Sequence, residues 1–388
     1  MSPQPQPTTL VPPPLGLYIH LPWCERKCPY CDFNSHETRV IPQEEYVDAL
    51  LRDLEGDLEL ARGRSVETLF IGGGTPSLFS PRAISRLLAS IGSLLQLSPA
   101  LEATMEANPG SAEAGRFAGF RAAGINRLSL GIQSFDDACL QALGRVHNSD
   151  QARAAIEYAR AAGFASFNID LMHGLPGQTP ATAETDLRAA LAFSPPHLSW
   201  YQLTIEPNTA FYKRPPALPL EDALADIQQA GEHLLAAAGH TQYEVSAYSR
   251  PGFRCRHNLN YWSFGDYLGI GAGAHGKISF ADGRIERYHK TRQPAEYLRA
   301  TAGIFTASTR RLAFADTVGE FMLNALRLNQ GFTRQLFEIR TGLDLAVIEP
   351  RLLQLREREL MECDDRGFRA SALGRRFLDS VIAEFFPD

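Results

Sequence analysis

Residues 15–31 have the sequence LGLYIHLPWCERKCPYC, in which a short apolar run leads directly into three closely spaced cysteines. The β-branched and aromatic residues of the opening run predict a β-strand. Cys24, Cys28 and Cys31 follow with C-x3-C-x2-C spacing, so the end of that strand presents three thiols on one short loop. Clustering of this kind in a reduced protein indicates a metal site.

The spacing of the three cysteines fits two kinds of metal site. Three thiolates can bind three irons of a 4Fe-4S cube and leave the fourth iron open to a substrate or cofactor. A zinc site of the Cys3His type, with His20 or His36 as the fourth ligand, is the alternative. The spacing alone does not separate these two sites.

Beyond the cysteines, strand and helix patterns alternate. Five further runs predict strands, at residues 67–71, 102–107, 126–132, 166–172 and 198–205. Helical spacing and good helix formers occupy the intervals between runs, at residues 43–62, 82–95, 112–123, 150–162 and 183–193. Such alternation predicts parallel strands joined by helical crossovers, as an α/β sheet or barrel with its ligands at the carboxyl ends of the strands.

Polar and glycine-rich loops follow the predicted strands, where a ligand site is expected. They are residues 20–31, 72–77, 106–109, 133–135 and 170–178. The glycines at the start of the second loop would let the backbone approach a small molecule, but they match neither nucleotide-binding glycine pattern. Another glycine-rich stretch, residues 269–273, lies outside a plain strand-helix-strand unit and predicts close backbone packing.

The chain divides into four predicted regions. Residues 1–14 are proline-rich and are expected to form a mobile tail. Residues 15–249 contain the alternating pattern, and residues 250–300, rich in Gly, Tyr and Phe, are expected to form a connector. Residues 301–388 carry mainly helical patterns and predict a smaller C-terminal domain.

Composition narrows the class of protein. Against 38 Lys and Arg stand 44 Asp and Glu, a net charge of −6, so a broad basic surface for nucleic acid is not expected. No apolar run is long enough to span a membrane, and the start of the chain lacks the basic residues of a signal peptide. The 6 cysteines are too few for a disulfide scaffold, which favours a cytoplasmic protein.

Taken in order, several motifs resemble those of one family. They are YIHLPWCERKCPYC, IGGGTPS, a strand ending in Glu106, GIQSF and DLMHGLPGQT. Together they resemble the radical S-adenosylmethionine (SAM) proteins, and within them the oxygen-independent coproporphyrinogen III oxidases and the related HemW-type heme chaperones. The resemblance runs from residue 15 to the C-terminus and implies an incomplete (β/α)6-type barrel followed by a smaller, mainly helical domain.

The resemblance also implies roles for individual residues. The three cysteines would hold a 4Fe-4S cluster, and the SAM amino and carboxylate groups would bind its fourth iron. The residues implied to contact or line the SAM site are Tyr18, Tyr30, Gly73, Gly74, Thr75, Glu106, Gln133, Arg145 and Asp170. Carboxylates and a guanidinium suit the ammonium, hydroxyl and carboxylate groups of that cofactor.

Two features separate the chaperones from the oxidases. Phe33 stands where the resemblance to the oxidases calls for a fourth cysteine. His257, Asn258, Tyr261 and Trp262 match the H-N-x-x-Y-W motif associated with heme binding in HemW-type proteins. Histidine and tyrosine both serve as heme axial ligands, and tryptophan offers an apolar face to a porphyrin.

The sequence therefore predicts a cytoplasmic chaperone that binds heme and passes it to an acceptor hemoprotein. A homodimer that depends on the cluster and brief contact with a membrane-bound acceptor are further expectations. A coproporphyrinogen III oxidase, which removes propionate carboxyl groups by SAM radical chemistry, is the alternative. Cleavage of SAM stays open, and no catalytic residue is assigned.

Overall fold

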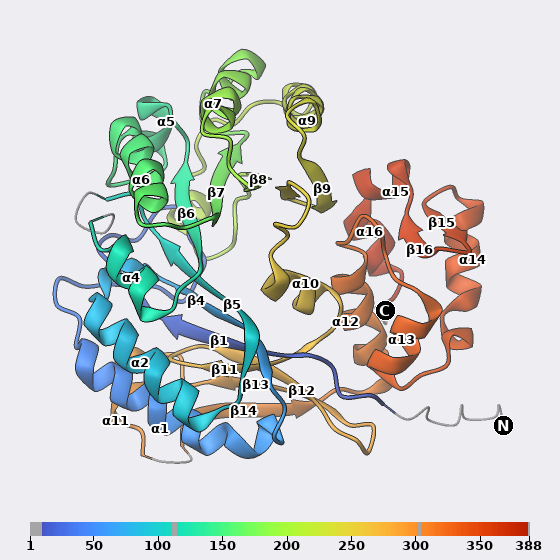
Figure 1. Cartoon of the computed structure of the whole chain (residues 1–388). Coiled ribbons are helices and arrows are strands. Elements are labelled where there is room, and N and C mark those ends of the chain that lie inside the picture. The colour runs from blue at the N-terminus through green and yellow to red at the C-terminus, as the bar shows by residue number, and fades with distance from the viewer. Residues whose placement is uncertain (1–9, 111–114, 302–303, 387–388) are drawn as a thin grey trace.

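The computed structural model describes residues 10–110, 115–301 and 304–386 (Figure 1). Its central feature is a row of parallel strands, each paired with the next in chain order. These are β1 (Leu15–Leu21), β4 (Val66–Gly73), β5 (Leu97–Ala107), β6 (Arg127–Gln133), β7 (Ser166–His173) and β8 (His197–Gln202). All six coincide with predicted runs, so the prediction of a parallel α/β sheet is confirmed.

Helices connect these strands and cover one face of the sheet (Figure 1). They are α1 (Gln43–Ala61), α2 (Pro81–Leu94), α4 (Phe117–Ala123), α5 (Asp137–Ala142), α6 (Ser149–Ala161) and α7 (Pro180–Ala192). A one-turn 3-10 helix, η1 (Pro76–Leu78), follows β4. Four of these connecting helices begin with a side-chain cap, for example α2, where the Ser80 side chain accepts a hydrogen bond from Ala83 N.

Successive side chains of β1 point alternately into the hydrophobic core and toward the candidate site. Leu17 and Ile19 are fully buried in the main hydrophobic core, which the strands form with the covering helices. Because successive side chains of a strand point to opposite faces, Tyr18 and His20 lie on the face of the sheet opposite α1 and α2. Both line a cavity there.

Further strands extend the sheet at both ends. They are β9 (Thr241–Glu244), β10 (Ala247–Ser249), β11 (Asp266–Ile270), β12 (His275–Ser279), β13 (Ile285–Lys290) and β14 (Thr306–Arg311). The full order is β14-β13-β12-β11-β1-β4-β5-β6-β7-β8-β10-β9. Three short helices and one long one accompany these strands: α8 (Ala210–Lys213), α9 (Glu221–Ala237), α10 (Arg256–Trp262) and α11 (Pro294–Arg299).

The prediction that residues 250–300 form a connector is wrong, because this stretch contains three strands, β11–β13, of the sheet beside β1. The strands were missed because glycines occupy positions at which an apolar or β-branched side chain would indicate a strand. At Gly269 a Cβ atom would lie 1.8 Å from the carbonyl oxygen of His275, and at Gly271 it would lie 2.3 Å from that of His20. The close backbone packing predicted for residues 269–273 is thus confirmed.

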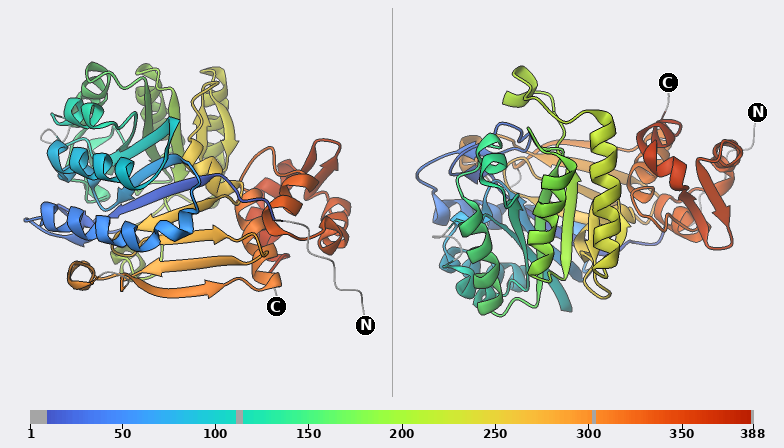
Figure 2. Two further views of the ribbon diagram at one scale, coloured as in Figure 1. Left: turned by 60° about the horizontal axis from the view of Figure 1, so that its bottom comes forward. Right: turned by 90° about the horizontal axis from the view of Figure 1, so that it is seen from above.

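The C-terminal part is mainly helical and has its own core. It contains α12 (Phe314–Ala325), α13 (Arg334–Thr341), α14 (Glu349–Glu357), α15 (Ala372–Arg376) and α16 (Leu378–Ala383), with a 3-10 turn η2 (Leu345–Val347) and a hairpin of β15 (Met361–Asp364) and β16 (Gly367–Ala370). Figure 2 shows these elements beside one end of the sheet. Since β14 belongs to the sheet, this part begins near residue 312 rather than at residue 301.

The proline-rich start of the chain departs from expectation where it can be followed. Residues 1–9 of the predicted mobile tail lie outside the described residues. Leu10 is 2% exposed and belongs to the C-terminal core, and Pro13 is also buried, so this end of the tail is attached to the fold at two positions. The Leu10 side chain holds this segment against the C-terminal core, because burying a leucine is favourable by about 1.5–3 kcal/mol. No helix in the described ranges has the length and apolar character needed to cross a membrane.

Replacing Phe321 by alanine should strongly destabilise the C-terminal core. The Phe321 side chain is fully buried, and its ring packs edge-on against those of Phe264, Phe332 and Phe337. Loss of a large buried ring costs about 3–5 kcal/mol in free energy of unfolding. Leu323→Ala on the same helix is the matched control, because Leu323 is 46% exposed. Equal urea midpoints for the two variants would contradict this assignment of the core.

Candidate functional site

The cysteine loop leaves β1 at the carboxyl end of the parallel sheet. A two-residue parallel pair, β2 (Trp23–Cys24) and β3 (His36–Glu37), closes its base. Within the loop, Cys31 N donates to the carbonyl oxygen of Cys28 at 3.1 Å. Cys24 is buried, Cys28 and Cys31 are half-buried, and none of the three is in a disulfide. The three predicted cysteines therefore lie on one loop whose base is closed by backbone pairing.

Each cysteine sulfur lies beside a polar hydrogen-bonding group. Thr75 Oγ1 donates to Cys24 Sγ at 3.5 Å, and Arg145 Nη1 donates to Cys28 Sγ at 3.5 Å. Ser35 Oγ lies 3.6 Å from Cys31 Sγ. Hydrogen-bond donors directed at sulfur stabilise a thiolate over a thiol, and thiolate is the form that binds iron.

Two of these donors are connected through Asn108. Its Nδ2 donates to Thr75 Oγ1 at 3.0 Å, and its Oδ1 accepts from Arg145 Nη2 at 2.6 Å. Arg145 Nη2 also donates to the carbonyl oxygen of Gly131 at 2.8 Å. A continuous set of hydrogen bonds thus runs from Cys24 to Cys28 through three loops. Thr75 and Arg145 were predicted site residues, whereas Asn108 was not.

The predicted zinc ligands do not face the cysteines. Each ring nitrogen of His20 lies 2.9 Å from another polar group, Tyr18 Oη for Nδ1 and the carbonyl oxygen of Asn34 for Nε2. His36 Nε2 lies 3.1 Å from Asn34 Oδ1. Within the described ranges, no three His, Cys, Asp or Glu side chains are grouped as ligands of a single metal ion.

The glycine loop after β4 packs directly against the end of β1. Gly74 N donates to the carbonyl oxygen of Leu21 at 2.8 Å, and Thr75 N donates to that of Trp23 at 2.7 Å. A Cβ atom on Gly74 would lie 2.4 Å from the same Trp23 oxygen. Gly73 has a φ of 116°, and a Cβ there would lie 2.7 Å from the His20 ring. Side chains at these positions would separate this loop from the cysteine loop.

Glu106 ends β5 with its carboxylate in the concave face of the sheet. Its Oε2 accepts a hydrogen bond from Gly73 N at 3.2 Å. Burial of the carboxyl, with a smaller contribution from nearby Asp170, raises the pKa of Glu106 from its ordinary 4.5 to about 8. Burial also raises the pKa of Asp170, which accepts from Ser129 Oγ and Asn168 Nδ2. The two carboxyl groups therefore share one secluded region, in which a cationic or hydroxylated ligand could pair with them.

The raised pKa of Glu106 predicts a pH dependence of stability. Between its ordinary pKa and about 8, folded protein keeps a proton that unfolded protein releases, so the free energy of unfolding falls as pH rises. In ligand-free Glu106→Gln this fall should be smaller, because the variant has no carboxyl group at this position to titrate. Each unit of pKa shift that the substitution removes should reduce the fall by about 1.4 kcal/mol. Urea unfolding across this range measures it. Glu67→Gln, at an exposed position of β4, should behave as wild type. Identical profiles for wild type and Glu106→Gln would show that the Glu106 carboxyl is ionised throughout.

Two predicted residues close the far side of the same region. Gln133 has a φ of 68°, and its Oε1 accepts from Tyr201 Oη at 2.8 Å. Tyr30 packs near Phe211, with 6.4 Å between ring centroids, in a small apolar cluster beside the cysteine loop. Both side chains thus contribute to the walls of the site.

A cavity of about 610 Å³ opens over β1 and β11–β13. Three predicted SAM-site residues line it, namely Tyr18, Gly73 and Glu106, together with Tyr261 of the predicted heme motif. Phe33 was noted only as a departure from the oxidases, and His20 only as a possible zinc ligand. The lining residues that sequence reasoning missed are Asn34, Tyr267, Gly273, His275, His289, Lys290 and Arg292. Most of these come from the stretch expected to be a connector, so no predicted strand indicated which way they point.

Asn34 fastens the cysteine loop to this second group of strands. Its Nδ2 donates to the carbonyl oxygens of Ala272 and Arg292, each at 2.9 Å. At Gly273 a Cβ atom would lie 2.3 Å from that Nδ2, so only glycine admits the contact. The cysteine loop and the β11–β13 wall of the cavity are therefore one connected unit.

The predicted heme motif forms α10, and one of its residues, Tyr261, lines the cavity. His257 is 1% exposed and stacks on Phe70 with 5.2 Å between ring centroids. Its Nδ1 lies 2.9 Å from Thr68 Oγ1, and its Nε2 lies 2.8 Å from Tyr261 Oη. Burial, with a smaller effect of the Arg127 charge, lowers the pKa of His257 to about 3, so the ring is neutral. His257 thus fixes Tyr261, which reaches the cavity.

The other motif residues lie apart from this cavity. The Trp262 ring lies under the Arg327 guanidinium, 4.3 Å from its centre, and lines a separate hollow of about 180 Å³. Asn258 is half-buried on α10, and no side-chain contact to the cavity places it there.

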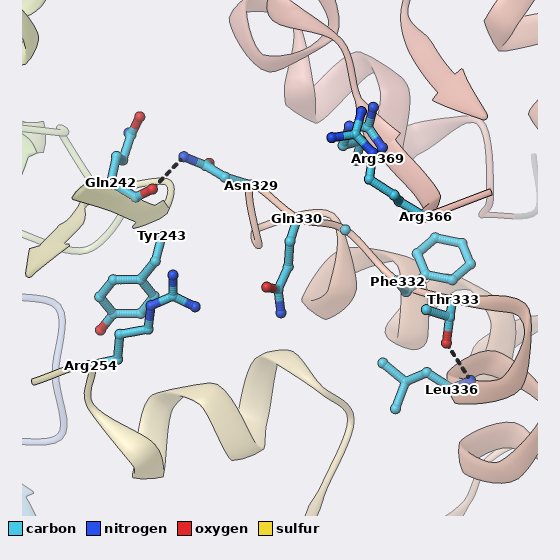
Figure 3. Close-up of a pocket in the computed structure, with 11 residues that line it drawn as sticks. Gln242, Tyr243, Arg254, Asn329, Gln330, Phe332, Thr333, Leu336, Arg366 and Arg369 are labelled. Carbon is cyan, nitrogen blue, oxygen red and sulfur yellow. Dashed lines mark hydrogen bonds between the residues drawn. The ribbon is translucent and has the colours of Figure 1, made fainter. Parts of the chain in front are cut away.

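A further hollow, of about 710 Å³, lies between β9 and the C-terminal part (Figure 3). Asn329 bridges its rim by donating from Nδ2 to the carbonyl oxygen of Gln242 at 3.0 Å. The guanidiniums of Arg366 and Arg369 are paired with Asp364 of the same hairpin. This hollow contains no predicted site residue, so the cavity over β1 is the candidate site.

Comparison with known proteins agrees with this site. The Radical SAM superfamily model matches residues 18–190, and the HemN C-terminal domain model matches residues 315–377. The "Heme chaperone HemW" of Escherichia coli is 50% identical over 378 residues, covering 97% of this chain and 99% of that protein. The chain belongs to the heme chaperone HemW family. The HemW of Haemophilus influenzae is 48% identical over 382 residues, with the same coverage of both chains.

A solved structure confirms the predicted fold of this HemW family member. The coproporphyrinogen III oxidase HemN of Escherichia coli superimposes with a TM-score of 0.81 at 26% identity, over 96% of this chain and 90% of that one. The radical SAM superfamily implies a 4Fe-4S cluster and SAM. The three cysteines, each beside a hydrogen-bonding group, and the glycine loop packed against them fit that pair of cofactors.

Proposed function

We propose that this HemW family member is a heme chaperone, which binds heme and passes it to an acceptor hemoprotein. The observation that carries the proposal is the 50% identity to a protein named heme chaperone HemW over nearly the whole of both chains. The cavity over β1 supports it, because tyrosines and histidines line it and both residue types bind heme iron.

Within this proposal, Cys24, Cys28 and Cys31 hold the 4Fe-4S cluster. When bound, the cluster supplies an iron corner to which the amino and carboxylate groups of SAM coordinate. Thr75 and Arg145 donate to the cluster sulfurs, which lowers their negative charge. The remaining proposed SAM contacts are Tyr18, Tyr30, Gly73, Gly74, Glu106, Gln133 and Asp170.

The H-N-x-x-Y-W residues act in this proposal by shaping the heme cavity. His257 holds the Tyr261 hydroxyl, and the Tyr261 ring packs edge-on against Tyr267 with 4.5 Å between centroids. Both tyrosines line the cavity, whereas Asn258 and Trp262 support α10 from outside it. Because cluster thiolates need reducing conditions, we place this chaperone in the cytoplasm. A cluster-dependent homodimer and transient contact with a membrane-bound acceptor belong to the same proposal.

The similarity to HemN favours a second function, oxidative decarboxylation of coproporphyrinogen III. Phe33 is the observation against it. Its side chain is 62% exposed beside the cavity, at the position where the resemblance to the oxidases calls for a cysteine. An exposed phenyl ring offers an apolar face to a porphyrin but ligates no metal.

Titration with hemin tests the proposal. Anaerobically reconstituted protein with a quantified cluster should give saturable heme binding in visible absorbance, and should pass that heme to an apo-hemoprotein. The same preparation with SAM, a reductant and coproporphyrinogen should form no protoporphyrinogen. Cluster-loaded protein that binds no heme would refute the chaperone, and SAM-dependent product would establish the oxidase.

A further inference from the structure

Two histidines of the cavity wall are cross-strand neighbours. His275 of β12 and His289 of β13 are directly opposite each other in the antiparallel register. Their ring centroids are 5.6 Å apart, with 37° between the ring planes. Residues opposite each other in such a pair project from the same face of a sheet. Both residues are exposed, and both line the cavity over β1.

The ring nitrogens of these two histidines are not engaged by hydrogen bonds within the described residues. In the described part of the chain, no hydrogen bond joins either ring to another side chain or to the backbone, whereas His20 and His257 each use both ring nitrogens. An imidazole that coordinates iron needs one free nitrogen. His275 and His289 satisfy this requirement. His257 does not, because it lies behind Tyr261 and both of its ring nitrogens have hydrogen-bond partners.

The surroundings of the pair suit a porphyrin. Tyr18, Tyr261 and Tyr267 supply flat aromatic surface in the same cavity, and Phe33 adds an exposed phenyl ring. Arg292 lies at the rim, held by its Nε donating to Asn34 Oδ1 at 3.3 Å, and a guanidinium is a partner for a propionate carboxylate. The volume, about 610 Å³, is in the range of cavities that bury a ligand larger than an amino acid.

We propose that His275 is the axial ligand of the heme iron in this cavity, with His289 beside it as the second imidazole. This inference rests on the proposed heme-chaperone function and names the residue that binds the metal. His275 is favoured over its neighbour because it lies on the strand nearer β1, close to His20 and the cysteine loop. Asn34 joins that loop to both ends of the β12–β13 hairpin, through Ala272 and Arg292.

The test is hemin titration of cluster-loaded wild-type protein beside His275→Ala, His289→Ala and His233→Ala. His233, on α9 and at a distance from the cavity in sequence and in fold, is the matched control. Loss of the metal ligand should weaken binding by at least about tenfold and change the absorption and electron paramagnetic resonance spectra of the bound ferric heme. Free imidazole should restore the wild-type spectrum to His275→Ala, which a purely structural role would not allow. His289→Ala should have a smaller effect, and His233→Ala none.

The outcomes separate the inference from the function on which it rests. Wild-type protein that binds no heme would refute the proposed function. Heme binding that is equal in wild type and His275→Ala would leave the chaperone standing and overturn the assignment of His275. The assignment is also overturned if His289→Ala, and not His275→Ala, changes the absorption and electron paramagnetic resonance spectra of the bound heme. Cluster content, measured in every variant, reports whether the barrel has folded.

Discussion

Cys28→Ser is expected to abolish loading of the iron-sulfur cluster while leaving the fold intact. Cys28 is half-buried on a surface loop, and its Sγ accepts a hydrogen bond from Arg145 at 3.5 Å. A hydroxyl preserves that contact but is a poor iron ligand, because soft thiolates are what iron-sulfur clusters require. Two remaining thiolates on the loop should not retain the cube.

Iron and sulfide content after anaerobic reconstitution, together with visible absorbance, measures the effect. Wild-type protein should contain about four irons and four sulfides per chain, and Cys28→Ser close to none. Cys363→Ser is the matched control, because Cys363 is also half-buried but lies on β15 in the C-terminal hairpin. Cluster loading of Cys28→Ser equal to that of Cys363→Ser would remove Cys28 from the set of ligands.

Gly74→Ala is the second substitution with a large expected effect. The added methyl carbon would lie 2.4 Å from the carbonyl oxygen of Trp23, which is backbone and has no rotamer by which to move away. Relief requires the glycine loop to separate from the start of the cysteine loop, which would break the hydrogen bond from Thr75 N to Trp23. Overpacking of this kind costs about 1–3 kcal/mol.

Calorimetric titration of the cluster-loaded protein with SAM should show up to about tenfold weaker binding for Gly74→Ala, if half of that strain falls on the site. Gly92→Ala is the matched control. Gly92 lies within α2, and a Cβ there meets only Leu97 Cδ1 at 3.6 Å. Alanine in a helix stabilises by about 0.5–1 kcal/mol over glycine, so this variant should unfold later and bind SAM as wild type does. Unchanged SAM affinity in Gly74→Ala would show that the loop does not contact the cofactor.

The fold could be predicted where each element has a clear local pattern. The runs around β1, β4 and β6 are apolar and bounded by helices with clear spacing, so periodicity identified them. The strands β11–β14 could not be identified in this way. β14 (Thr306–Arg311) has every residue exposed, and β12 has glycine and lysine where a strand usually presents apolar side chains. These strands pair antiparallel with their neighbours in sequence, and only β11 pairs with β1, which is remote in the sequence.

The residues of the candidate site could likewise be predicted only where they form a local sequence pattern. The cysteine loop is a local pattern, and the residues from Cys24 to Cys31 predicted it directly. By contrast, the two exposed histidines of the cavity belong to a hairpin, β12–β13, whose strands carry little apolar alternation. His257 illustrates the reverse: its motif was recognisable in sequence, but its burial behind Tyr261 follows from packing against Phe70. Sequence thus located the chemistry of the loops better than the orientation of the side chains.

The place of β1 within the sheet bears on the order in which the molecule is made. β1 pairs on one side with β4 and on the other with β11, whose residues end at Ile270. The cysteine loop that follows β1 is fastened by Asn34 to Ala272 and Arg292. During synthesis one edge of the N-terminal strand therefore stays unpaired until most of the chain has left the ribosome. Maturation of the cysteine loop is then a late event, because a chain that ends before Ala272 lacks the contacts by which Asn34 fastens this loop to the second group of strands.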